Sequence, residues 1–153
     1  MSGLEQLYQQ IIIDHSKHPH GVGLAEGEET SHQRNPVCGD EITLALRWDA
    51  AGERVESVAW EGSGCSISQA SASLLATLAE ESVEEGSPWT PEELTALIEE
   101  FREALRSRGA TPLDEDRFGD AAALSGVSKY VARVKCAMLA WVAAEDLLQR
   151  RAG

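Results

Sequence analysis

The stretch DEITLALRW, residues 40–48, decides the fold of this chain. Apolar side chains stand at every second position of its central part, which predicts a β-strand with one buried face. Residues 49–53 are mostly polar or small and contain a glycine, so we expect a hairpin connection there and a returning strand at about 54–60. The register of the returning strand stays open, because Val55 falls on the face opposite to that of the other apolar residues.

Helical patterns flank this hairpin on both sides. Before it, apolar residues at helical spacing predict an amphipathic helix at about 3–17, and a loop at 21–37 with at most one short edge strand follows. After it, helices are expected from Ser66 onward, from the capping box Thr90-Pro91-Glu92-Glu93 to Gly109, near 120–125 and at about 132–150. Because strands come first and helices follow, we predict an α+β fold, a small antiparallel sheet of about three strands covered by helices.

Length and composition indicate one domain. The chain has 153 residues, 42% of them hydrophobic, so we expect a single domain at 1–153 with its own core. No apolar run approaches the roughly 18–20 residues that cross a bilayer, and no basic region followed by an apolar stretch opens the chain, so we expect a cytoplasmic protein without membrane contact. The 26 acidic against 13 basic residues give a net charge of −13, which disfavours nucleic acid as a partner.

The three cysteines carry most of the chemistry in this chain. Cys38 is separated from Asp40 by one glycine, so a thiolate and a carboxylate can turn toward a common point. Cys65 precedes a helical pattern and Cys136 opens, or nearly opens, the last helix, and helix N-termini favour thiolate over thiol. The odd count disfavours disulfides. Three thiolates and one carboxylate suit tetrahedral Zn²⁺, while the alternative is that the cysteines are simply small buried residues.

Charged residues are distributed unevenly along the sequence. Glutamates crowd residues 80–100, whereas Arg34, Lys129, Arg133 and Lys135 lie close to the cysteine motifs. Cations beside a thiol lower its pKa, so a basic rim around the cysteines would favour their reactive form. The histidines, most of which lie near the end of the first helix, are interpreted as surface or capping residues.

Six short motifs together resemble the IscU/NifU-type proteins of iron–sulfur cluster assembly. They are LY at 7–8, IIDH at 12–15, NPVCGD at 35–40, EGSGCSIS at 61–68, LSGV at 124–127 and RVKC at 133–136. The resemblance covers nearly the whole chain, and each cysteine lies in its own matching motif. It implies an IscU/SufU-like fold and a role in iron–sulfur cluster assembly.

Two departures from the IscU scaffolds look like the SufU branch of that superfamily. Lys135 stands where those scaffolds have a histidine before the third cysteine, and an extra acidic helical segment lies at about 82–107. The resemblance to this branch implies a zinc-dependent sulfurtransferase of the SUF system. Its zinc ligands would be Cys38, Asp40, Cys65 and Cys136.

The resemblance also implies a mechanism and partners. A PLP-dependent cysteine desulfurase of the SufS type would donate persulfide sulfur, and one of its histidines would replace Cys38 at the zinc so that Cys38 can attack the persulfide. Arg133, one helical step from Cys136, would orient Asp40 or the incoming sulfur. Downstream cluster-assembly proteins would receive the product. The alternatives are a scaffold that builds a transient [2Fe–2S] cluster on the same four residues, and a purely structural zinc domain.

Overall fold

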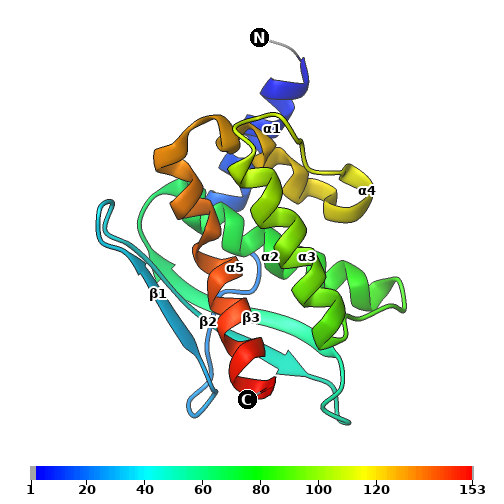
Figure 1. Ribbon diagram of the computed structural model, residues 1–153. Coiled ribbons are helices and arrows are strands. Elements are labelled where there is room, and N and C mark those ends of the chain that lie inside the picture. Colours follow the sequence, from blue (N-terminus) through cyan, green and yellow to red (C-terminus); the bar gives the residue numbers. More distant parts are fainter. Residues whose placement is uncertain (1–2, 153) are drawn as a thin grey trace.

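The computed structural model describes residues 3–152 of the chain. Its elements in chain order are α1 (Gly3–Lys17), β1 (Ser31–Asn35), β2 (Asp40–Trp48), β3 (Val55–Ser63), α2 (Ser66–Glu84), α3 (Pro91–Arg106), α4 (Glu115–Phe118), the 3₁₀ segment η1 (Gly119–Lys129) and α5 (Val131–Ala152). A small sheet lies beside α2 and α5, and α3 packs against α5 (Figure 1). This arrangement confirms the predicted α+β class.

The sheet has three antiparallel strands in the order β1-β2-β3, so β1 is the short edge strand expected within residues 21–37. Leu46 pairs with Val58, but Trp48 pairs with Val55, and Glu56 is therefore one extra residue in β3. Such a β-bulge inverts the alternation of side chains beyond it. Val55 is consequently buried together with Val58, which explains why periodicity alone left the register open.

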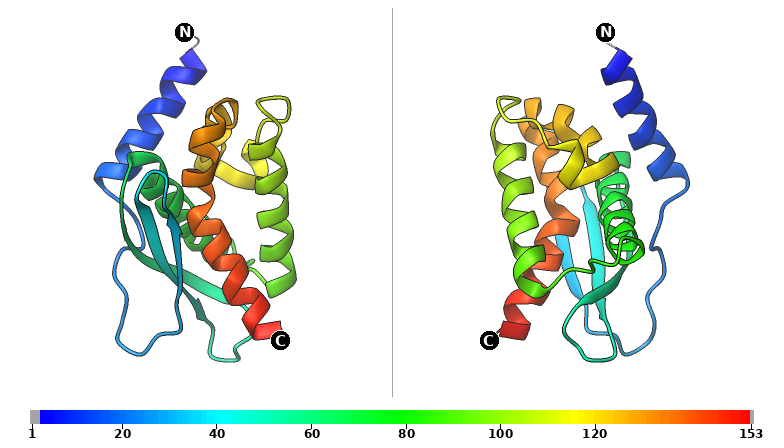
Figure 2. Two further views of the ribbon diagram at one scale, coloured as in Figure 1. Left: turned by 60° about the vertical axis from the view of Figure 1, so that its left-hand side comes forward. Right: turned by 90° about the vertical axis from the view of Figure 1, so that its right-hand side faces the viewer.

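Helices α2 and α5 pack together on one face of the sheet, α5 against β1 and β2 and α2 mainly against β3 (Figure 2). Most buried side chains of α2 are alanine or serine, and these short side chains let neighbouring elements approach it closely. The hydroxyl of Ser71 donates to the Ala137 carbonyl at 2.6 Å and accepts from the Trp141 indole at 2.9 Å. The two buried polar groups therefore satisfy each other.

Helix α3 completes the core on the other side of α5. The predicted capping box is present, with Thr90 and Glu93 each accepting a hydrogen bond from the backbone of the other. The ring of Phe101 stacks on Trp141 of α5, with centroids 3.9 Å apart and an interplanar angle of 8°. This stacked pair of fully buried aromatic rings joins the acidic helix α3 to the middle of α5.

Helix α1 packs on α2 and η1 at the surface of the molecule. None of its residues is buried, and Leu4 and Leu7 are 52% and 55% exposed. Its first half projects from the rest of the molecule in both views of Figure 2. Nearer its end, Nδ1 of His15 lies 2.7 Å from the hydroxyl of Ser73 in α2. His15 is therefore half-buried and links two helices, which differs from the surface or capping role expected of it.

The segment before α5 differs from the single short helix expected near 120–125. The four-residue α4 leads directly into the 3₁₀ segment η1, and Gly119 at their junction has a φ of 52°. Glycine adopts this left-handed conformation without steric cost, so the chain can change direction there. Across residues 3–152, no helix combines the length and the apolar character needed to cross a membrane.

Candidate metal centre

Separate parts of the chain meet at one end of the sheet. Cys38 lies in the turn between β1 and β2, and Asp40 is the first residue of β2. Cys65 is the N-cap residue of α2, as the sequence predicted. Cys136 is the sixth residue of α5, in its second turn, so it lies deeper in the helix than the expected position at its start.

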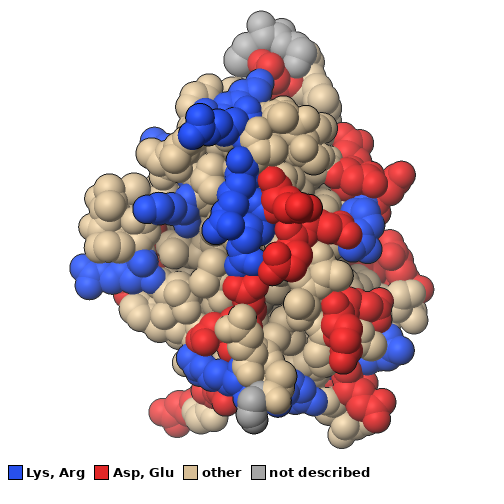
Figure 3. Space-filling model, viewed as in Figure 1, with Lys and Arg blue, Asp and Glu red and all other residues tan. Residues whose placement is uncertain are grey.

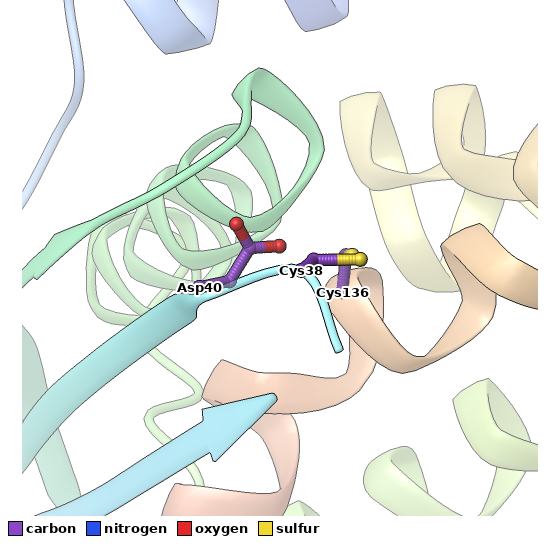
Figure 4. A group of neighbouring side chains, drawn as sticks. All are labelled: Cys38, Asp40 and Cys136. Atoms are coloured by element: carbon purple, nitrogen blue, oxygen red, sulfur yellow. The ribbon is translucent and has the colours of Figure 1, made fainter. Parts of the chain in front are cut away.

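The side chains of these residues occupy one small region. Cys38, Asp40 and Cys136 each place one ligand atom within 4.8 Å of the other two. Figure 4 shows the sulfurs of Cys38 and Cys136 side by side, with a carboxylate oxygen of Asp40 pointing toward them. Cys65 joins the group through Asp40, since its Sγ donates to Oδ2 at 3.2 Å and its backbone N–H donates to Oδ1 at 2.8 Å.

The turn that carries Cys38 is shaped by its neighbours. The N–H of Gly39, whose φ is 75°, donates to the Asn35 carbonyl at 2.8 Å, and the N–H of Val37 donates to the Asn35 side chain at 3.2 Å. The buried amide of Asn35 also points its Nδ2 at the Cys136 sulfur, 3.7 Å away. Asn35 was missed as a site residue, although asparagine before proline is a recognisable turn signal.

The loop before α2 approaches Asp40 so closely that only glycine fits. Gly64 has a φ of 129°, and a Cβ at this position would collide with Oδ1 of Asp40. Gly64 is part of the motif EGSGCSIS, but the motif alone does not predict the role of this glycine. The role depends on how near the loop comes to the first residue of β2, which only the folded structure shows.

The three thiols differ strongly in burial. Cys38 is exposed, Cys65 is intermediate and Cys136 is fully buried. Burial raises the pKa of the Cys136 thiol, and its hydrogen bond with Asp40 raises that pKa further. In the absence of a metal, burial and the Asp40 carboxylate therefore favour the Cys136 thiol over the thiolate that the sequence predicted.

Asp40 keeps its charge despite being 1% exposed. Burial raises the pKa of its carboxyl, but hydrogen bonds from Cys136 and from the backbone and side chain of Cys65 outweigh that effect. The nearby charge of Arg133 also lowers the pKa, and the net result is a pKa below the ordinary value. A buried carboxylate held in its ionised form beside three sulfurs is a strong candidate for a cation ligand.

The donor set fits a tetrahedral metal ion. Zinc binds sulfur at about 2.3 Å and carboxylate oxygen at about 2.0–2.2 Å, so its ligand atoms lie roughly 3.3–3.8 Å apart. The 3.2 Å between Cys65 Sγ and Asp40 Oδ2 is close to this spacing, and the 4.8 Å within which Cys38, Asp40 and Cys136 gather is within reach of small side-chain rotations. Three sulfurs and one oxygen fill four positions, which is typical of a closed site and not of one that activates water.

Comparison with known proteins places this chain in a family. Residues 7–137 match the model described as "NifU-like N terminal domain". The chain is 35% identical to the protein named iron-sulfur cluster assembly scaffold protein IscU of Streptococcus pyogenes serotype M1, over 99% of this chain and 89% of that protein. It is also 35% identical to zinc-dependent sulfurtransferase SufU of Bacillus subtilis, over 99% of this chain and 96% of that protein.

A solved structure of a similar protein has the same fold as this chain. A crystal structure from Fervidobacterium islandicum, described as a putative iron-sulfur cluster assembly scaffold protein for the SUF system, superposes with a TM-score of 0.71 at 29% identity. The superposition covers 95% of this chain and 99% of that chain. Because the family model matches most of the chain, the chain belongs to the NifU-like N-terminal domain family.

Proposed function

We propose, from the premise that this chain belongs to the NifU-like N-terminal domain family, that it serves iron–sulfur cluster assembly as a zinc-dependent sulfurtransferase. In this proposal Cys38 accepts sulfur as a persulfide from a PLP-dependent cysteine desulfurase. Lys135 supports the choice, because the resemblance to IscU scaffolds implies a histidine at this position and the chain does not have one.

The observation that carries the proposal is the exposure of Cys38. Of the three thiols at the centre, only this one is exposed, and it lies on a turn instead of a helix. A persulfide carried by another protein has to reach the accepting sulfur, and thiol–disulfide exchange depends on access as well as on thiolate character. Cys136 fails the requirement of access, because it is fully buried.

The transfer step balances without an external oxidant. The Cys38 thiolate attacks the outer sulfur of the donor persulfide, and a new sulfur–sulfur bond forms to Cys38 Sγ. The sulfur–sulfur bond of the donor breaks, and its electron pair leaves with the donor's inner sulfur as a thiolate. The proton on the outer sulfur moves with that sulfur, so the product is a Cys38 persulfide and a regenerated donor thiolate.

The other residues of the centre are proposed to hold and orient. A zinc ion bound by Cys38, Asp40, Cys65 and Cys136 would keep the thiols deprotonated and the loops in place. Asp40 fixes the loop before α2 through its two hydrogen bonds with Cys65. Arg133 is exposed, and its charge acts on Asp40. We therefore propose that Arg133 orients Asp40 or the incoming sulfur.

The proposal extends to the organisation of the chain and to its partners. We propose that residues 1–153 act as one domain in which the acidic helical segment at about 82–107 is an addition. The donor would be a cysteine desulfurase, and later cluster-assembly proteins would receive the sulfur. Docking near Arg133 and Lys135 is consistent with their exposure beside Cys136.

A second candidate function is that of a scaffold on which a [2Fe–2S] cluster is assembled as cargo. Two relatives at 35% identity, from Streptococcus pyogenes and Thermotoga maritima, are named IscU scaffold proteins. Three thiolates and a carboxylate suit either a zinc ion or a cluster. The donor set therefore supports both candidates, and metal content has to distinguish them.

One experiment separates the two functions. The protein is purified without added iron, its zinc and iron are measured, and its visible spectrum is recorded. A colourless protein with one zinc per chain supports sulfur transfer, and it should then accept a persulfide from a desulfurase with cysteine as substrate, detected by mass spectrometry. A brown protein that contains iron and acid-labile sulfide would support the scaffold, and it would overturn the zinc-dependent proposal.

A further inference from the structure

A groove beside the metal centre has not been used so far, except that Lys135, one of the residues near which docking is proposed, lines it. It has a volume of about 630 Å³ and lies between the segment that precedes Cys38, the end of α3 and the first turns of α5. This volume lies within the range of sites that bind ligands. The groove begins immediately next to two of the proposed metal ligands, since Val37 precedes Cys38 and Lys135 precedes Cys136.

Positive charge dominates the walls of this groove. Its lining residues include five cations and no Asp or Glu, although the chain contains twice as many acidic as basic residues. Arg102 is neutralised by Glu145, to which it donates two hydrogen bonds at 2.6 and 2.9 Å. The four other cations form no ion pair with any residue in the described part of the chain: Arg34, Arg106, Arg108 and Lys135.

The placement of these four cations is selective. Elsewhere, four arginines form ion pairs with Asp or Glu, as expected for a chain with an excess of acidic residues. In Figure 3, Lys and Arg form a band over the upper part of the face on which α3 and α5 lie, and Asp and Glu lie to one side of it. Of the eight Lys and Arg residues that form no ion pair within the described residues, four therefore line this groove.

The floor of the groove is apolar and adaptable. Leu105 of α3 and Val134, Met138 and Val142 of α5 line it, and Met138 has a flexible side chain that can fit different shapes. Val131 at its edge is 61% exposed. A ligand that matched this groove would combine negative charge at the walls with an apolar group on the floor.

We infer that this groove binds an acidic peptide segment of a partner protein, whose carboxylates meet the four cations and whose apolar side chain lies against the floor. A nucleic acid fits less well, because no aromatic side chain lines the groove on which a base could stack. A long polyanion would also be repelled by the net charge of −13 on the chain. A short segment interacts mainly with charges within the Debye length of about 8–10 Å, and here these are the cations of the groove. The inference rests on the groove and does not depend on the sulfur-transfer proposal.

A binding experiment tests the inference with the whole zinc-loaded protein. The probe is a fluorescein-labelled peptide of alternating glutamate and leucine, and its binding is followed by fluorescence anisotropy. The groove variant carries Arg106→Gln and Arg108→Asn, because Asn tolerates the positive φ of 56° at Arg108. The control variant carries Lys17→Gln and Arg151→Gln, which removes the same charge away from the groove and from the metal centre.

We expect the groove variant to bind the peptide at least about tenfold more weakly than the control variant, with zinc content unchanged in both. Added salt should weaken binding to the control variant, since the contact is largely ionic. A peptide with serine in place of leucine should bind more weakly than the original. Equal affinity of the peptide for the groove and control variants would overturn the inference, and so would equal affinity of the serine and leucine peptides. Full displacement of the peptide by inorganic phosphate would also overturn it. So would self-association of the protein, detected by light scattering, that the groove variant abolishes.

Discussion

Replacing Gly64 with alanine tests whether the close approach of two loops holds Asp40 in place. Gly64 precedes Cys65 and has a φ of 129°, a backbone conformation that side-chain-bearing residues rarely adopt. A Cβ added there would overlap the carboxylate of Asp40 and would force it to move. The substitution adds one methyl group, so it changes neither the charge nor the number of thiols at the centre.

The expected cost has two parts. An unfavourable φ at a residue with a side chain costs about 1–3 kcal/mol. Displacing Asp40 breaks the hydrogen bonds that Cys65 donates to it at 2.8 and 3.2 Å, and hydrogen bonds to a charged group contribute about 1.5–3 kcal/mol each. Because the loop can relax in part, we expect Gly64→Ala to lower the free energy of unfolding by about 3–5 kcal/mol.

Gly39→Ala is the matched control for this substitution. Gly39 also has a positive φ, 75°, and lies next to both Cys38 and Asp40, but a Cβ there meets no atom within 4 Å. It should therefore cost only the conformational penalty, about 1–2 kcal/mol. Most of the difference between the two variants should therefore come from the collision with Asp40.

The two variants are compared by urea unfolding after chelation and by zinc affinity from competition with a chromogenic chelator. Chelation removes the contribution of the metal, so the unfolding data report on the polypeptide itself. We expect zinc affinity to fall at least about tenfold further in Gly64→Ala than in Gly39→Ala, because Asp40 no longer points at the sulfurs. Equal losses of stability and of zinc affinity in the two variants would refute the reasoning.

Four further predictions address the proposed function and the fold. Cys38→Ala should carry no persulfide after desulfurase turnover, and a persulfide found on another cysteine by mass spectrometry would contradict the assignment. Arg133→Glu should lower the desulfurase rate that the protein stimulates by about tenfold, and Glu53→Lys, a reversal far from the site, should leave it unchanged if zinc is retained in both. Zinc removal should lower the melting temperature by many degrees, since binding to the folded state alone stabilises it, and an unchanged melting curve would exclude a tight site. Arg102→Gln should lower the free energy of unfolding at neutral pH by about 2–3 kcal/mol. The hydrogen bonds from Arg102 hold the pKa of Glu145 below its ordinary value, so this stabilisation is complete above pH 4.5 and is lost as the pH falls through the lowered pKa. Stability curves of the two proteins should therefore converge in acid.

Local patterns were sufficient to predict most of the secondary structure, because they depend on neighbours in the sequence. Alternation in β2 and the capping box at Thr90 are examples, and both are present. The bulge at Glu56 could not be predicted, since one extra residue inverts the alternation without any distinctive residue type. The start of α5 at Val131 lies within one residue of the predicted start at about 132, but Cys136, as its sixth residue, lies too deep to open the helix.

The candidate site could be predicted from the sequence for a different reason. Its thiols and carboxylate are chemically distinctive and lie in short motifs, so their residue types alone indicated a soft-metal centre. The residues that shape the site carry no such signature. Asn35 contacts Cys136, which lies 101 residues away, and Gly64 makes room for Asp40 from another loop. Such roles exist only once the fold has brought distant segments together.

The elements that carry the three thiols also decide which of them can leave a metal. Moving Cys136 away would require α5 to shift, and α5 packs on the sheet, α2 and α3. Moving Cys65 would break its hydrogen bonds to Asp40 and disturb the N-cap of α2. Cys38 lies in a turn held by two hydrogen bonds to Asn35, so its release disturbs no helix or strand. If one ligand leaves the metal to accept sulfur, the architecture therefore favours Cys38.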